Sequence, residues 1–265
     1  MWIDTHCHLD AAEFAGEHEA VASDAQRAGV SRIVIPAIGR ANFGTVAALA
    51  AACQNGAYAL GIHPMFVPQA DEADLVLLRA SIPAALQDPR FLAIGEIGLD
   101  FFIPELTVPP LREKQEHFYV EQLKIARDFD LPVLLHVRRS QETLLKHLRR
   151  IRVRGGCAHA FNGSFQQAHQ FIELGFKLGL GGAMTFTRAL QIRRLATELP
   201  LAALVLETDA PDLSPAWLHP ARNSPAQIPQ IGAALAHLRD LPVEAIATAT
   251  TANALVAMPR LASLY

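Results

Sequence analysis

The sequence predicts a single (β/α)8 TIM barrel, an α/β fold, over residues 1–265. Short β-branched and apolar runs alternate with longer Ala- and Leu-rich stretches that carry charges at helical spacing, which is the pattern of repeated βα units. Eight such runs occur, at residues 2–6, 32–36, 57–62, 92–97, 132–136, 156–159, 176–180 and 204–207. Eight strands in 265 residues give about 33 residues per unit, the length that this barrel requires.

A doubly wound open sheet is the rival α/β architecture. That fold carries a Gly-rich dinucleotide turn after its first strand, whereas this chain places His6 and His8 there. No linker-like stretch or shift in composition divides the chain, so we expect one domain. The Pro-rich stretch 104–110 is expected to be a long loop after the fourth strand that could form a lid or a substrate wall.

The composition is that of a globular protein. The 23 Lys and Arg residues nearly balance 26 Asp and Glu, and 51% of the residues are apolar, which argues against a nucleic-acid coat protein and against a disordered chain. No stretch approaches the ~20 uninterrupted apolar residues of a membrane span, and the N-terminus lacks a signal-peptide pattern. We therefore expect a cytoplasmic monomer with no membrane partner. The three cysteines have no paired spacing and are expected to be mostly buried thiols.

Ionisable side chains follow the predicted strands at the end where barrel active sites are built. His6 and His8 are separated by one residue, so they face the same way on an extended chain. Other strands end at further candidates, which are His63, Glu96, Asp100, His136, His159 and Asp209. A single histidine after a strand is more often structural, but repetition in the same register favours a shared site at the C-terminal rim.

The candidates include a mixed nitrogen and oxygen donor set. Its members are His6, His8, Glu96, His136, His159 and Asp209. The set is large enough for two divalent ions if one carboxylate bridges them, and Glu96 is the best bridge. Two ions about 3.5–4 Å apart can activate water and stabilise charge on a leaving oxygen, so hydrolysis is the expected reaction. These donors suit Zn, Mn, Fe or Ni, and Mg more weakly, so the metal stays open.

Several motifs that contain these residues occur in order along the chain. They are His6-Cys7-His8, Gly61-Ile62-His63-Pro64, Gly95-Glu96-Ile97-Gly98-Leu99-Asp100, His136-Val137-Arg138, His159-Ala160-Phe161-Asn162-Gly163-Ser164 and Glu207-Thr208-Asp209-Ala210-Pro211. In combination, from residue 2 to about residue 256, the chain resembles the TatD-type metal-dependent deoxyribonucleases. The resemblance implies a TIM barrel in which His6, His8, Glu96 and Asp209 hold one metal ion. The second ion would lie between Glu96, His136 and His159.

The resemblance further implies metal-dependent hydrolysis of DNA phosphodiester bonds, often in the 3′-to-5′ exonuclease direction with a preference for single strands. The catalytic residues are then Asp209, as the general base that orients a water for attack on phosphorus, and Glu96, as the bridge between the ions. Phosphate contacts are expected from His63, Arg138 and Arg222. Each has a structural alternative, which for Arg138 is a salt bridge to Glu96 or Asp209.

Two other functions stay open. The same metal pair could hydrolyse a small ester, lactone, cyclic amide or aminoacyl-tRNA ester. The net charge of −3 and the absence of a basic stripe keep this alternative credible. A barrel that binds metal and a protein partner without catalysis is less favoured, because such a scaffold has no evident need for Asp209.

Three further features receive mainly structural interpretations. The cluster Arg149, Arg150, Arg152 and Arg154 is expected to be a solvated helix end at the bottom of the barrel. The sequence Asn162-Gly163-Ser164 could offer backbone N–H groups to phosphate or could simply open the next helix. Phe101 and Phe102 stand where many TatD-type proteins carry tyrosine, which removes a phenolic contact and leaves aromatic stacking on a base.

Overall fold

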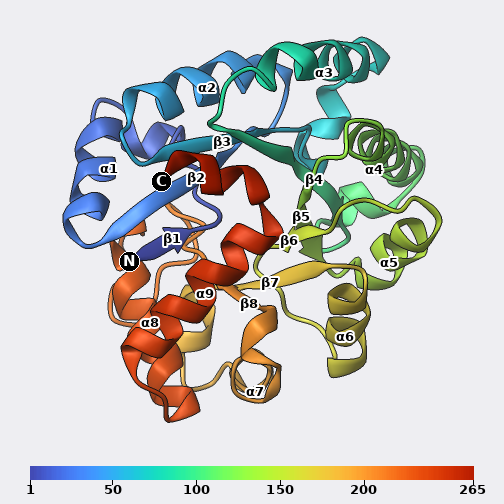
Figure 1. The fold of residues 1–265 in the computed structure, drawn as a ribbon. Coiled ribbons are helices and arrows are strands. Elements are labelled where there is room, and N and C mark those ends of the chain that lie inside the picture. The colour runs from blue at the N-terminus through green and yellow to red at the C-terminus, as the bar shows by residue number, and fades with distance from the viewer.

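The computed structural model describes residues 1–265 and contains eight parallel strands surrounded by helices (Figure 1). The strands are β1 Trp2–Asp4, β2 Val30–Pro36, β3 Gly56–Leu60, β4 Phe91–Asp100, β5 Val133–Arg138, β6 Gly156–Ala158, β7 Phe176–Leu180 and β8 Leu204–Leu206. They pair in chain order, and the Thr5 N–H donates to the Leu206 carbonyl at 3.0 Å, which joins the last strand to the first. The predicted (β/α)8 barrel is confirmed, and each predicted strand overlaps an observed one.

Helices cover the outside of the sheet. They are α1 His18–Arg27, α2 Phe43–Ala52, α3 Glu72–Ala85, α4 Leu111–Asp128, α5 Gln141–Arg150, α6 Phe165–Glu173, α7 Leu190–Glu198, α8 Ile228–Arg239 and α9 Val243–Ala257. Two begin with side-chain caps: Asp71 accepts the Ala73 N–H before α3, and Ser164 accepts the Gln167 N–H before α6. Ser164 therefore opens the next helix, as the structural interpretation of that motif expects.

The C-terminal segment closes one end of the barrel. In Figure 1, α9 and the turn Pro259–Leu264 cross in front of the strands. Their apolar side chains Ala254, Ala257, Met258 and Leu261 pack with residues from several strands, including Ile3, Val34, Ala59, Leu134 and Val205. The Arg260 guanidinium donates to the Phe91 carbonyl at the start of β4. Because this end is filled, a substrate can reach the interior only from the opposite, C-terminal end of the strands.

The Pro-rich stretch 104–110 and the arginines at the end of α5 lie at opposite ends of the barrel. The Pro-rich stretch lies between β4 and α4, but none of its residues lines the cavity described below, so it is no substrate wall in this structure. Residues 104–107 instead form a short 3₁₀ turn that buries Leu106. The arginines at the end of α5 lie at the closed end of the barrel, where Arg154 pairs with Asp130 at 2.8 Å.

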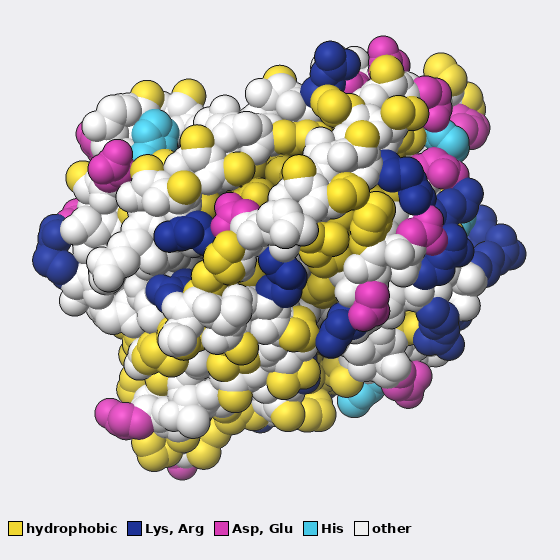
Figure 2. All heavy atoms as spheres, turned by 45° about the horizontal axis from the view of Figure 1, so that its top comes forward, with side chains coloured by type: hydrophobic (Ala, Val, Ile, Leu, Met, Phe, Trp, Pro, Cys, Tyr) yellow, Lys and Arg dark blue, Asp and Glu magenta, His cyan; other side chains and the backbone are white.

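Positively charged side chains are unevenly distributed over the outside of the molecule. Figure 2 shows Lys and Arg side chains gathered on the side that carries α4 and α5 in Figure 1.

None of the helices has both the length and the apolar character that crossing a membrane demands.

We predict that Leu261→Ala destabilises the fold. Leu261 is fully buried in the closed end, and removing a buried leucine side chain there should lower the free energy of unfolding by about 2–5 kcal/mol. The matched control is Val256→Ala in α9, whose side chain is 66% exposed and should change stability by less than about 0.5 kcal/mol. Urea unfolding of both variants in chelator measures the difference, and equal midpoints would contradict this account of the closed end.

Candidate metal centre

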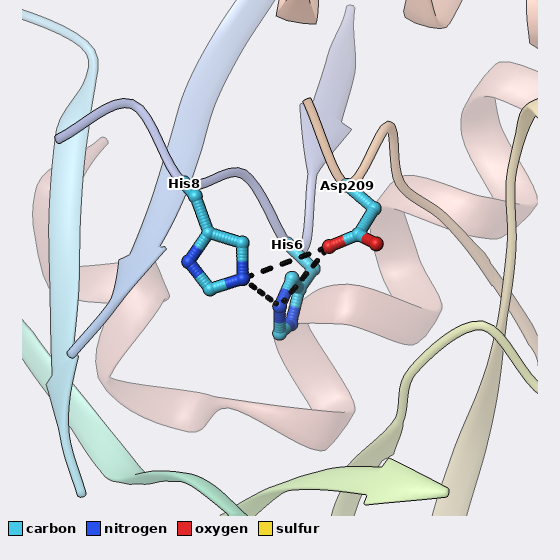
Figure 3. A group of neighbouring side chains, drawn as sticks. All are labelled: His6, His8 and Asp209. Carbon is cyan, nitrogen blue, oxygen red and sulfur yellow. Dashed lines mark hydrogen bonds and ion pairs between the residues drawn. The ribbon is translucent and has the colours of Figure 1, made fainter. Parts of the chain in front are cut away.

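The first donor cluster combines the two histidines that follow β1 with Asp209, which follows β8. Figure 3 shows their side chains pointing toward one another. The Nε2 atoms of His6 and His8 lie 3.3 Å apart, and Asp209 Oδ1 is 3.6 and 3.7 Å from them. Asp209 adopts a left-handed backbone with φ 56°, and its N–H donates to the His6 carbonyl at 2.9 Å. A strained backbone position at a convergent polar site is a frequent mark of function.

Glu96, in β4, connects this first cluster to a second one. Its Oε2 lies 3.1 Å from His6 Nε2 and 3.4 Å from His8 Nε2. Its other oxygen, Oε1, lies 2.9 Å from His136 Nδ1 and 3.1 Å from His159 Nε2. The carboxylate is completely buried. The structure therefore brings all six predicted metal ligands together, with Glu96 between the two groups.

His63, expected to contact substrate, lies inside the second cluster. Its Nε2 is 3.0 Å from His136 Nδ1 and 3.4 Å from Glu96 Oε1. Its Nδ1 accepts the Met65 N–H at 3.1 Å. A neutral His63 therefore carries its proton on Nε2 and presents an N–H donor to the site rather than a lone pair.

Two carboxylates that lie outside the predicted donor set face the histidines. Asp100 Oδ2 lies 3.1 Å from His136 Nε2, and Glu207 Oε1 lies 3.5 Å from His159 Nδ1. Asp100 is within hydrogen-bond distance of His136, whereas Glu207 faces His159 at ion-pair distance. In both rings the other nitrogen faces Glu96. The available signal was their position, because Asp100 ends β4 and Glu207 directly follows β8.

A third buried carboxylate, Asp4, joins the two strand ends that carry the first cluster. It accepts hydrogen bonds from the Thr208 hydroxyl at 2.6 Å, from the Thr208 N–H at 3.0 Å and from the His6 N–H at 3.2 Å. His6 and Asp209 are therefore attached to one shared anchor, which fixes the distance between their backbones.

The electrostatics of the cluster fit a bound cation. Burial alone would raise the pKa of Glu96, but the surrounding histidines hold it well below its ordinary value. Its Oε2 is buried and accepts no hydrogen bond. A buried carboxylate oxygen without a donor is costly unless a cation satisfies it. The nearby imidazoles supply further lone pairs, so the residues present fit divalent metal ions.

A cavity of about 940 Å³ opens over these groups at the C-terminal end of the barrel. His8, His63, Glu96, His136, His159 and Asp209 line its floor, and Arg138 lines its rim. The alternative for Arg138, a salt bridge to Glu96 or Asp209, is not formed. Its Nη1 instead lies 3.7 Å from Asp100 Oδ2, and its guanidinium stacks 3.9 Å from the centre of the Phe102 ring.

Arg222 is not brought to the cavity, contrary to expectation. Its guanidinium pairs with Glu17 at 2.8 Å, donates to the Glu13 carbonyl and lies over the Phe14 ring. These groups precede α1, so the loop after β8 packs against that segment, and Arg222 is not among the residues that line the cavity.

The barrel and its donor cluster define a metal-dependent hydrolase. The protein-family model described as TatD related DNase matches residues 3–258, and the chain belongs to this family. It is 41% identical to the uncharacterized metal-dependent hydrolase YjjV of Escherichia coli, and 95% of each chain is covered. It is 38% identical to an uncharacterized metal-dependent hydrolase of Haemophilus influenzae, and 96% of this chain and 97% of the other are covered. The crystal structure of Escherichia coli YjjV superposes with a TM-score of 0.90 over 97% of this chain and 98% of the other.

We predict that Glu207→Gln weakens metal binding by about 10- to 100-fold, because His159 loses the carboxylate that orients it. Gly179→Ala should act in the same direction, since a Cβ at that position would overlap Glu207 Oε2. Glu198→Gln, on the exposed side of α7, is the matched control. Competition with a chelating dye gives the Kd for Zn or Mn, and an unchanged Kd in Glu207→Gln would contradict this role.

Metal binding should also weaken as the pH falls. Burial opposes protonation of His8, but Glu96 and Asp209 together raise its pKa to about 9, whereas burial raises the pKa of Asp209 to about 6. A ligand must lose its proton before it binds. Below about pH 9 His8 therefore releases a proton when the metal binds, and His159, whose pKa the nearby carboxylates hold well above its ordinary value despite burial, releases another. Below about pH 6 Asp209 adds a further proton. Calorimetry in buffers of different ionisation enthalpy counts these protons, and a count of zero at pH 7 would refute the assignment.

Proposed function

We propose that the protein is a deoxyribonuclease that removes nucleotides from single-stranded 3′ ends with two divalent ions. The observation that carries the proposal is Glu96: its Oε2 faces His6 and His8, and its Oε1 faces His136 and His159. His6, His8, Asp209 and Glu96 Oε2 would hold one ion. His136, His159 and Glu96 Oε1 would hold the other, which Zn, Mn, Mg, Fe or Ni could supply.

Family relationships support a DNA substrate. The matching family is described as TatD related DNase. A human relative, Deoxyribonuclease TATDN3, is 29% identical over 99% of this chain and 96% of its own. The direction of cleavage, the preference for single strands, the cytoplasmic location and the monomeric state stay predictions.

The residues have separate roles in this proposal. Bound ions would lower the pKa of a water and stabilise negative charge on the phosphate oxygens. Asp209 lines the cavity with its side chain 15% exposed, so its carboxylate would be placed to orient a metal-bound water and accept its proton. The N–H of His63 and the guanidinium of Arg138 would bind phosphate oxygens.

One observation favours a second candidate, hydrolysis of a small ester, lactone or amide. Asp10, Glu13 and Asp212 also line the cavity, and their charge disfavours a polyanion that would cross the whole opening. A small neutral substrate would meet no such repulsion. This candidate uses the same metal ligands and differs only in what the cavity walls select.

We predict that Asp209→Asn lowers nucleotide release by at least about 100-fold, the usual contribution of a general base. The substrate is a labelled single-stranded DNA with a free 3′ hydroxyl, tested with Mg, Mn, Zn and chelator. Asp240→Asn, at the exposed end of α8, is the control. If folded, metal-loaded wild type released no nucleotide with any of these metals, the small ester, lactone or amide would become the favoured substrate. A wild-type rate in folded, metal-loaded Asp209→Asn would remove Asp209 from the mechanism.

A further inference from the structure

Three side chains on one side of the cavity form an exposed aromatic and cationic surface. They are Phe102, after β4, and Arg138 and Arg139, at the end of β5; we call them the Phe102 platform. The guanidinium carbons of Arg138 and Arg139 lie 3.9 and 4.7 Å from the centre of the Phe102 ring. Phe102 remains 45% exposed although it is a large apolar side chain.

The backbone beneath the platform is fixed from both strands. The Phe102 N–H donates to Asp100 Oδ1 at 2.8 Å, and the Phe101 N–H donates to the Arg138 carbonyl at 2.9 Å. Arg139 is held in the left-handed region at φ 57°, which is unfavourable for a residue with a side chain. The platform is therefore built in place, rather than formed by a free loop.

The platform carries positive charge that the protein leaves largely uncompensated. Arg139 makes no ion pair, and the single partner of Arg138 is Asp100, at 3.7 Å, which also contacts His136. Within a chain of net charge −3, this is a local cationic surface beside the metal ligands. Its combination with an exposed aromatic ring is typical of surfaces on which single-stranded nucleic acids stack.

Acidic side chains also line the cavity. Asp10, Glu13 and Asp212 come from the segments that follow β1 and β8, whereas the platform comes from the ends of β4 and β5. β4 and β5 are adjacent, and β8 joins β1 on the other side of the ring of strands. The cavity therefore has a cationic side and an anionic side, separated by the metal ligands.

We infer that the Phe102 platform binds the nucleotide that adjoins the scissile phosphate, with its base stacked on the exposed aromatic and guanidinium surfaces and its phosphate against Arg139. This inference rests on the proposed nuclease function and deepens it. The substrate strand continues over the platform alone, because its phosphates are repelled on the side of Asp10, Glu13 and Asp212. The chain end therefore occupies the anionic side, and the same asymmetry confines cleavage to the ends of a strand.

The test compares two substrates in each variant. One is a single-stranded oligonucleotide, and the other is the p-nitrophenyl ester of thymidine 5′-phosphate, which has a single nucleoside. In Phe102→Ala and Arg139→Ala, the ratio of kcat/KM for the oligonucleotide to kcat/KM for the ester should fall about tenfold, within the range that base stacking on an aromatic ring supplies. Phe102→Trp should retain the ratio. The matched control is Arg152→Ala, on the exposed loop between α5 and β6, which should leave the ratio unchanged.

An abasic nucleotide placed at successive positions of the oligonucleotide identifies the stacked base. At one position next to the cleaved bond, the abasic nucleotide should raise the KM of wild type about tenfold. The same nucleotide should not raise the KM of Phe102→Ala further, because the missing base and the missing ring remove the same contact. Equal ratios in Phe102→Ala and Arg152→Ala, or equal abasic effects in Phe102→Ala and wild type, would overturn the inference alone. Absence of nucleotide release by wild type would instead overturn the proposed function on which it rests.

Discussion

The buried carboxylate of Glu96 is the constraint around which the open end of the barrel is organised. Taking a carboxylate out of water costs several kcal/mol unless partners compensate for it. The partners come from different strand ends: His6 and His8 after β1, His136 in β5 and His159 after β6. A parallel barrel is a fold that can bring so many chain segments to one point, because all its strands end at the same rim.

Precision at that point depends on groups behind the donors. Asp100 contacts the outer nitrogen of His136, Glu207 faces the outer nitrogen of His159 at ion-pair distance, and Asp4 joins the first strand to the segment after the last. Gly179 leaves the space that Glu207 occupies. The closed end of the barrel, filled by α9 and the C-terminal turn, supplies the rigid base on which these contacts are built. The orientation of the histidines therefore depends on contacts from several parts of the barrel.

The floor and the walls of the cavity differ in their chemistry. The floor supplies the donors that a hydrolase needs, and its chemistry would serve a phosphodiester, an ester or an amide. The walls differ, because an aromatic and cationic surface lies above β4 and β5 while acidic side chains lie above β8 and β1. In the proposed function, a polyanionic strand would have a favourable path over only one of these sides, and the walls would set which substrates reach the donor cluster.

The sequence by itself determined the barrel, its eight strands and the six candidate metal ligands, because those features depend on local patterns and on the rule that ionisable residues at strand ends share one rim. Tertiary packing decided the rest. It placed His63 beside His136 and Glu96, set Asp100 and Glu207 against the outer nitrogens of two histidines, and directed Arg222 to Glu17 instead of the cavity. These outcomes depend on how loops pack and which neighbours their side chains meet, and spacing along a single chain does not encode those distances.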